Sequence, residues 1–234
     1  MINFKNNLEK KLLFLQRNEF LSPSQIKMRK LFGRSLFTKF LIYFFQDKNL
    51  DKKVFYKIKN EFESIIKYLP KNATNIMDIG CGIGLIDIFI NNHYTNCQKF
   101  YLLDKNSIDN KVVYGFSENY ESYNLNNITK NFLINNNIKE SKLNLIDVDS
   151  DFYIKPKSID LCISLVSMGY HYPLSIYLET IKEVSNENTV FIFDIATEYQ
   201  DLDNVKKYFS KVEIIETVNS KHPRLRIACY NIIK

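Results

Sequence analysis

The sequence predicts an α/β fold: a doubly wound, seven-stranded, mostly parallel sheet that ends in an antiparallel hairpin and follows an N-terminal helical extension. Two patterns carry this prediction. After Pro70, short β-branched runs alternate with amphipathic segments of helix length, which is typical of βαβ units. Near the C-terminus, two strand-like runs are separated by only 5 residues, 219–223, which are too few for a crossover helix, so these strands should be antiparallel.

The expected elements follow one another in the order that such a sheet requires. Runs rich in β-branched and aromatic residues predict parallel strands at about 75–79, 98–103, 143–148, 159–165 and 188–194. The hairpin strands are expected at 211–218 and 224–233. Amphipathic segments predict helices at about 84–93, 117–136, 174–185 and 201–209. Residues 71–234 therefore predict the core domain.

Residues 1–70 predict helices only, and we expect this extension to serve as a lid or as a wall for the substrate. Leucines 8, 12, 13 and 15 fall close to one face of a first helix. A second helix is expected to begin at Ser22-Pro23-Ser24-Gln25, with Ser as N-cap and Pro at the first helical position, and to continue through the apolar segment 36–45. A third is expected at about 52–68, before Pro70.

The composition excludes several classes of protein. With 45% hydrophobic and 25% charged residues, the chain is expected to fold. The most apolar segment, 36–45, is too short for a membrane span, which needs about 20 residues. The N-terminus lacks a signal-peptide pattern, and the four scattered cysteines predict neither a disulfide framework nor a metal site. We therefore expect a cytoplasmic protein that binds no metal.

The net charge of +6 is unevenly distributed. Residues 1–70 hold 15 Lys and Arg against 6 Asp and Glu, whereas residues 71–234 hold 17 against 20. A basic extension thus precedes a slightly acidic core. The excess charge favours an anionic acceptor near the extension. A solvated helix pair, a surface for RNA or for a membrane, and a homodimer interface are the alternatives that stay open.

One segment carries the chemistry, Asp78-Ile79-Gly80-Cys81-Gly82-Ile83-Gly84 at the first βα turn. Glycines allow a sharp turn and let a ligand approach main-chain N–H groups at a helix N-terminus. The spacing is G-x-G-x-G, whereas turns that bind dinucleotides prefer G-x-G-x-x-G, so a nicotinamide cofactor is the less favoured alternative. The Asp78 carboxylate would repel a pyrophosphate and attract an ammonium group. Asp104, at the end of the second predicted strand, is suited to accept hydrogen bonds from both ribose hydroxyls.

With these residues and the terminal hairpin, segment 71–234 resembles the class I S-adenosylmethionine-dependent methyltransferases, which have a Rossmann-like fold. The resemblance implies methyl transfer with S-adenosylmethionine as cofactor. It implies that the glycine turn and the carboxylate before it hold the methionine part, and that acidic residues after the second and third strands hold the ribose and the adenine amino group. The residues so implied are Asp78, Gly80, Cys81, Gly82, Gly84, Asp104 and Asp149, with Ser164 and Leu165 beside the methyl group.

The segment 164–173, after the fourth predicted strand, is expected to face the acceptor, because open α/β sheets bind ligands at the carboxyl ends of their strands. His171 is the candidate general base for a hydroxyl acceptor, since an imidazole titrates close to neutral pH. A structural role of this histidine in an aromatic cluster is the alternative. Tyr114, Tyr170 and Tyr172 are the expected substrate-binding residues.

A combination of three patterns, Y-G-F at 114–116, Y-N at 123–124 and S-x-G-Y-H-Y-P at 167–173, loosely resembles a branch of bacterial methyltransferases often assumed to act on sugars. The expected acceptor is therefore a small molecule with a hydroxyl on a carbohydrate or on a phosphorylated or nucleotide-linked metabolite. Two alternatives remain. One is an RNA methyltransferase that holds RNA with its basic helices, and the other is a non-catalytic partner subunit that binds S-adenosylmethionine.

Overall fold

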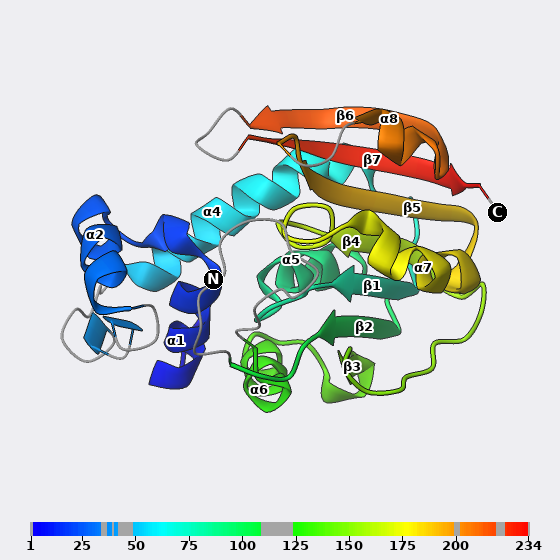
Figure 1. Cartoon of the computed structure of the whole chain (residues 1–234). Coiled ribbons are helices and arrows are strands. Elements are labelled where there is room, and N and C mark those ends of the chain that lie inside the picture. The colour runs from blue at the N-terminus through cyan, green and yellow to red at the C-terminus, as the bar shows by residue number, and fades with distance from the viewer. Residues whose placement is uncertain are drawn as a thin grey trace.

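The computed structural model describes residues 2–33, 37–38, 40–41, 49–108, 124–198, 202–218 and 223–233. Within them, seven strands form one sheet in the order β3-β2-β1-β4-β5-β7-β6 (Figure 1). The first five strands in this order are parallel, whereas β7 runs antiparallel to both β5 and β6. The predicted sheet with its closing hairpin is confirmed. The strands are β1 (Asn75–Ile79), β2 (Lys99–Asp104), β3 (Leu143–Asp147), β4 (Ile159–Ser164), β5 (Ser185–Ala196), β6 (Phe209–Val218) and β7 (Arg224–Ile232).

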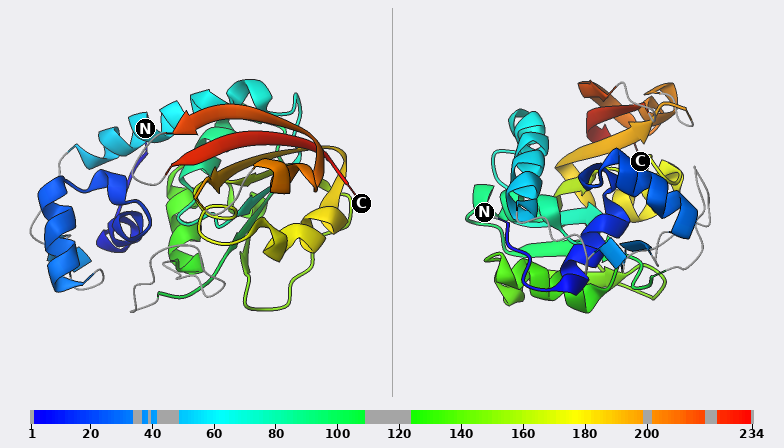
Figure 2. Two further views of the ribbon diagram at one scale, coloured as in Figure 1. Left: turned by 45° about the horizontal axis from the view of Figure 1, so that its top comes forward. Right: turned by 90° about the vertical axis from the view of Figure 1, so that its left-hand side faces the viewer.

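Alternate residues of the central strands point to opposite faces of the sheet, and each face has its own apolar cluster. On β1, Ile76 belongs to one cluster and Met77 to the other, and on β4 Leu161 and Cys162 divide in the same way. Helices therefore cover both faces (Figure 2). The first cluster includes side chains of α4 (Leu50–Ile65), α5 (Leu85–His93) and α6 (Asn126–Asn135), and the second includes side chains of α7 (Leu178–Val184) and α8 (Leu202–Lys206).

Helix α1 (Asn7–Gln16) shares the core of the sheet. Its buried Leu12 belongs to the first cluster, and the preceding Phe4 stacks on Phe132 of α6 with ring centroids 5.0 Å apart. The main chain of Asn3 exchanges two hydrogen bonds with the side chain of Asn136, at 2.9 and 3.1 Å. These contacts attach α1 to the edge of the sheet toward which the arrowheads of β1 and β2 point (Figure 1).

Two predicted helices are wrong in extent. Helix α2 (Pro23–Phe32) begins as predicted, with Ser22 as N-cap in a capping box, but it does not continue into 36–45. It ends because Gly33 adopts a positive φ of 80°. The described residues of the segment 36–45, which are 37, 38, 40 and 41, are helical as predicted, and the others lie outside the described part of the chain. The helix predicted at 117–136 begins only at Asn126, because Leu125 is extended; residues 117–123 lie outside the described part.

The other boundaries differ from prediction by a few residues. The third N-terminal helix is α4, continued by a 3₁₀ turn at Ile66–Tyr68. A 3₁₀ turn at Leu174–Tyr177 precedes α7, and β5 is already extended from Ser185. In the part of the chain that the structure describes, no helix combines the length and the apolar character needed to cross a membrane.

Candidate cofactor and acceptor site

Main-chain hydrogen bonds hold the glycine turn after β1 against the end of β2. The N–H of Gly80 donates to the carbonyl oxygen of Leu103 over 2.7 Å, and the N–H of Gly82 donates to Oδ2 of Asp104, also over 2.7 Å. Gly80, Gly82 and Gly84 have φ angles of 72°, 55° and 78°, in the region that favours glycine. The turn therefore passes directly into α5 at the carboxyl edge of the sheet.

Close contacts are a second reason for glycine in this turn. A Cβ on Gly80 would lie 1.7 Å from Oγ of Ser167, in the loop after β4. A Cβ on Gly82 would lie 2.8 Å from Oε1 of Gln16, the last residue of α1. The loop after β4 and the end of α1, which are distant in sequence, therefore both approach the turn at its glycines.

Asp104 ends β2 beside the turn. Its Oδ2 accepts the hydrogen bond from Gly82, and its Oδ1 accepts one from the N–H of Lys105 over 2.8 Å. Burial raises the pKa of Asp104 to about 6; the two hydrogen bonds oppose this rise, and Asp147, its neighbour in register on β3, adds to it. A carboxylate has about four lone-pair positions, so Asp104 can accept further hydrogen bonds from a ligand.

Two buried carboxyl groups, Asp78 on β1 and Asp87 on α5, lie next to the turn, with exposed fractions of 3% and 0%. Neither oxygen of Asp87 has a hydrogen-bond donor among the described residues, so its contact with Asp78 is a hydrogen bond only when the pair shares a proton. Burial raises the pKa of Asp87 to about 7. Burial, Asp87 and Asp104 raise the pKa of Asp78 well above its ordinary range, and Arg17 opposes that shift. A cationic ligand would favour ionisation of the pair.

The acidic segment after β3 lies beside Asp104. Oδ1 of Asp147 accepts hydrogen bonds from the N–H groups of Asn106 and Asp149, over 3.3 and 3.2 Å. The Asp149 side chain is 61% exposed, and its carboxylate pairs with Nζ of Lys105 at 3.6 Å. Asp149 is therefore an exposed neighbour of the strand ends. Among the described residues, no group of three or more His, Cys, Asp or Glu side chains could hold a metal ion.

The loop after β4 is tied to the end of β1. The hydroxyl of the buried Ser164 donates to the carbonyl oxygen of Ile79 over 2.6 Å and accepts from the N–H of Met168 over 2.9 Å. The next residue, Leu165, is also buried. Val166 has a φ of 60°, which is unusual for a β-branched residue, so the loop leaves the strand through a strained position.

The aromatic residues of this loop take different positions. Tyr172 is buried, and its hydroxyl lies 3.0 Å from Oγ of Ser167, the atom that would clash with a Cβ on Gly80. Tyr170 is partly buried, which raises its pKa, and its ring meets the exposed His171 edge-on with centroids 4.8 Å apart. The loop therefore brings Tyr172 to the turn and presents His171 to solvent. The predicted Tyr114 lies outside the described residues.

Sequence reasoning does not find Gln16 or Asp87. Oε1 of Gln16 accepts a hydrogen bond from the N–H of Ile83 over 3.0 Å, across 67 positions of the chain, and no pattern in the sequence marks that contact. Asp87 does have a signal, because an acidic residue near the start of a largely apolar helix is buried and needs a partner.

Solved structures match the chain, whereas no protein-family model and no curated protein sequence does. An assumed O-methyltransferase from Nostoc punctiforme matches with a TM-score of 0.50 and 12% identity, over 75% of this chain and 56% of its own. A SAM-dependent methyltransferase from Aquifex aeolicus matches with a TM-score of 0.49 and 11% identity, over 74% of this chain and 96% of its own. A tRNA methyltransferase from Aquifex aeolicus matches with a TM-score of 0.49 and 13% identity, over 76% of this chain and 69% of its own. At these identities the likeness concerns the fold, and the chain has the fold of the class I methyltransferases.

The close approach of Ser167 to Gly80 predicts a specific loss of stability. We expect Gly80→Ala to lower the free energy of unfolding by about 3 kcal/mol or more, because a Cβ adds a clash to an unfavourable φ. Gly33→Ala is the matched control: its φ is also positive, but nothing lies within 4 Å of its Cβ, so a loss of about 1 kcal/mol is expected. Urea unfolding measures both. The double variant Gly80→Ala/Ser167→Gly should recover the part due to the clash, and equal losses at the two glycines would contradict the contact.

The buried acid pair predicts how stability depends on pH. The raised pKa of Asp87, about 7, means that its ionisation costs stability as pH rises from about 4 to 7. Asp87→Asn removes this cost and keeps a donor for Asp78. Each pKa unit corresponds to about 1.4 kcal/mol, or to about 3–6 °C in a chain of this size, so the melting temperature of the variant relative to wild type should rise by several degrees between pH 5 and pH 8. Asp203→Asn, at an exposed position, should show no such change; a flat difference for Asp87→Asn as well would contradict the pairing.

Proposed function

We propose that this chain is a cytoplasmic S-adenosylmethionine-dependent methyltransferase that acts on a small molecule, at a hydroxyl of a carbohydrate or of a phosphorylated or nucleotide-linked metabolite. The observation that carries the proposal is the arrangement of two carboxylates, Asp78 and Asp104, on the two sides of a glycine turn in this fold. Two carboxylates in these positions suit a ligand with a ribose, whose hydroxyls donate hydrogen bonds, and with a cationic ammonium group.

The residues at this edge of the sheet fit S-adenosylmethionine. Asp104 retains acceptor positions for the two ribose hydroxyls. Asp78 would receive the ammonium group of the methionine part, and that cation would offset the cost of a buried carboxylate. The exposed Asp149 would meet the adenine amino group. The turn residues Gly80, Cys81, Gly82 and Gly84 would lie against the methionine chain.

The chemistry that the chain itself supplies is positioning and proton transfer. When bound, S-adenosylmethionine supplies an electrophilic methyl group. His171 would accept the proton of the acceptor hydroxyl on its imidazole as that oxygen forms its bond to the methyl carbon. Tyr170 would contact the acceptor beside it, and Tyr172 would do so nearer the turn. Ser164, which holds the loop to β1, and the buried Leu165 beside it would support the methyl side.

The basic extension favours an anionic acceptor, and it is also the observation that favours a second candidate, methylation of RNA. The two candidates differ in their dependence on salt, because each phosphate neutralised by Lys or Arg releases counterions. Binding of RNA through the extension would therefore weaken steeply as salt increases. A non-catalytic subunit and a homodimer through the N-terminal helices are the remaining alternatives.

Asp104 is the test of the cofactor. We expect Asp104→Asn to weaken binding of S-adenosylhomocysteine about 10-fold or more in calorimetry, because charge-assisted hydrogen bonds to the ribose are lost. In wild type, affinity should fall as pH decreases through about 6, where Asp104 becomes protonated, and the variant should lose this part of the pH dependence while it keeps the part due to Asp78 and Asp87. Asp203→Asn should bind as wild type does. Unchanged binding by Asp104→Asn would exclude this residue from the ribose site.

His171 is the test of the acceptor side. With methyl-labelled S-adenosylmethionine, we expect label to enter a small-molecule fraction, and His171→Gln to reduce turnover about 100-fold or more without changing affinity for S-adenosylhomocysteine. His93→Gln, at the far end of α5, is the control. Near-normal turnover of His171→Gln would contradict the general-base role. Label entering RNA would favour the second candidate, and label entering no fraction would favour a non-catalytic subunit.

A further inference from the structure

The start of β7 lies close to the loop that carries His171. Arg224, the first residue of β7, is paired with Ala196 at the end of β5. On its other side, the N–H of Ala196 donates a hydrogen bond to the carbonyl oxygen of Gly169 over 2.9 Å, so the loop extends the sheet beyond β4. Because neighbouring strands lie about 4.8 Å apart, Arg224 is two strand spacings from the main chain of Gly169.

The next residue of the loop, Tyr170, responds to the charge of Arg224. Burial raises the pKa of Tyr170, and among the charged groups that act on it Arg224 has the largest effect and lowers it. Asp194, Glu198 and Glu19 have smaller effects and raise it. Of these acids, Asp194 is buried, Glu198 is exposed, and Glu19 already forms an ion pair. The pairing of the strands and the electrostatics therefore agree that Arg224 is a neighbour of the expected acceptor side.

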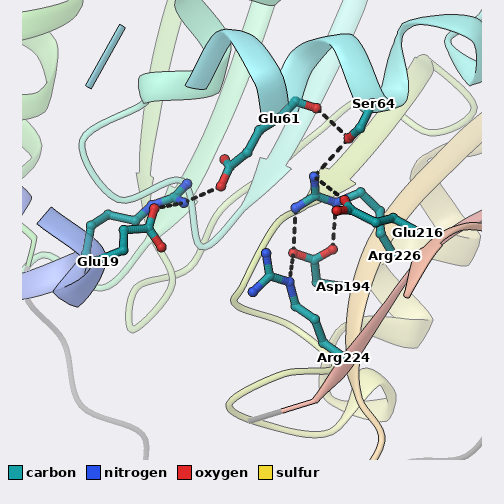
Figure 3. Close-up of polar contacts among 8 residues, drawn as sticks. Glu19, Glu61, Ser64, Asp194, Glu216, Arg224 and Arg226 are labelled. Carbon is teal, nitrogen blue, oxygen red and sulfur yellow. Dashed lines mark hydrogen bonds and ion pairs between the residues drawn. The ribbon is translucent and has the colours of Figure 1, made fainter. Parts of the chain in front are cut away.

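Arg224 shares one buried carboxylate with a second arginine. Arg226, two residues further along β7 and on the same face of the sheet, donates hydrogen bonds to both oxygens of Asp194, over 2.7 and 2.9 Å. Nε of Arg224 lies 3.3 Å from Oδ2 of Asp194, which makes an ion pair without the geometry of a hydrogen bond. Figure 3 shows Asp194 between the two guanidinium groups. The carboxylate is thus held by Arg226 and compensates Arg224 only in part.

Further contacts fix the pair of Arg226 and Asp194 in place. Nη1 of Arg226 donates to Oγ of Ser64 over 3.1 Å, and the Ser64 hydroxyl donates to the carbonyl oxygen of Glu61, one turn earlier on α4 (Figure 3). Another acid, Glu216, lies 3.8 Å from the same Nη1, but its side chain is half exposed. Inside the buried group, two guanidinium charges therefore face one carboxylate, and positive charge is in excess.

Arg224 has donors that the protein itself does not use. Among the described residues, its Nη1 and Nη2 form no hydrogen bond and no ion pair. These two nitrogens point away from Asp194 in Figure 3. The outer edge of a guanidinium carries two parallel N–H groups, which match two oxygens of a phosphate or of a carboxylate. With a side chain only 16% exposed, Arg224 holds this edge in a fixed direction.

We propose that Arg224 binds a phosphate group of the acceptor and thereby selects phosphorylated or nucleotide-linked molecules as substrates. This assignment rests on the proposed function. His171 belongs to the loop beside Arg224, so a phosphate held by this arginine keeps a hydroxyl of the same molecule near the candidate base. A phosphate dianion is preferred to a carboxylate, because the attraction to an excess positive charge increases with the charge of the ligand. The positive charge that recognises the acceptor then lies on β7, in the core domain.

The first measurement uses inorganic phosphate as the probe, in calorimetry at constant ionic strength. Arg224→Gln should weaken phosphate binding about 10-fold or more, because two charge-assisted hydrogen bonds are lost. The variant is expected to fold, since Asp194 keeps both hydrogen bonds from Arg226. Arg224→Lys keeps the charge without the planar fork, so its loss should be intermediate, and it decides the question if Arg224→Gln does not fold. Lys206→Gln, at an exposed position of α8, removes the same charge and should bind phosphate as wild type does.

The second measurement is the charge of the methylated product. With methyl-labelled S-adenosylmethionine and a metabolite extract, we expect label in a fraction that an anion exchanger retains. Treatment with phosphatase and phosphodiesterase should release that label from the exchanger. Arg224→Gln should need about 10-fold more extract for half-maximal labelling, whereas its affinity for S-adenosylhomocysteine should change by less than about 2-fold.

The other outcomes overturn the assignment in distinguishable ways. If wild type binds no phosphate, or if the Arg224 variants bind it equally well, Arg224 is not an anion site. The same loss in Lys206→Gln means that only the overall charge matters. A neutral product, or an anionic product that the two enzymes leave unchanged, excludes phosphate as the recognised group. If phosphate binding depends on Arg224 but label enters no small molecule, the proposed function fails and only the anion site is supported.

Discussion

The meeting of three strand ends at Gly80 is the constraint on which the rest of the structure depends. The N–H of Gly80 donates a hydrogen bond to the carbonyl oxygen of Leu103, the residue before the end of β2. Ser167, in the loop after β4, occupies the space that a side chain on Gly80 would need. The hydrogen bond from the Ser164 hydroxyl to the carbonyl oxygen of Ile79 also joins the ends of β4 and β1. Because these ends are in van der Waals contact, every polar side chain that they carry is gathered within one small region of the carboxyl edge.

That gathering has an electrostatic cost. Asp78, Asp87 and Asp104 come together in a region with little water, and burial raises the pKa of each. Main-chain hydrogen bonds to Asp104 and the charge of Arg17 near Asp78 lower these pKa values again, but only in part. A cation bound against these carboxylates would offset that cost. Buried acidic groups that lie close together lower the stability of the folded protein and can contribute to binding. A strongly shifted pKa of a carboxyl group is for that reason an indicator of a functional site.

The sequence could predict what depends on local pattern. The strand 75–79 is found at its predicted residues, because a short β-branched run before glycines is unambiguous, and the spacing from the turn to Asp104 follows from one βαβ unit. The end of α2 was visible in Gly33, but the apolar residues after it favoured a longer helix. The contact of Gln16 with Ile83 could not be predicted, because it depends on how α1 packs on α6, and no local pattern encodes packing between elements so far apart.

The attachment of α1 has a consequence for the order in which the protein acquires its structure. Asn3 and its partner Asn136 are separated by 133 positions, so α1 leaves the ribosome long before its docking surface exists. At about 5–20 residues per second, the delay is on the order of ten seconds. A helix of 10 residues is marginal by itself, and its apolar side stays exposed during that time. Helix α1 is thus synthesised well before α6 but reaches its final position only after α6 has formed.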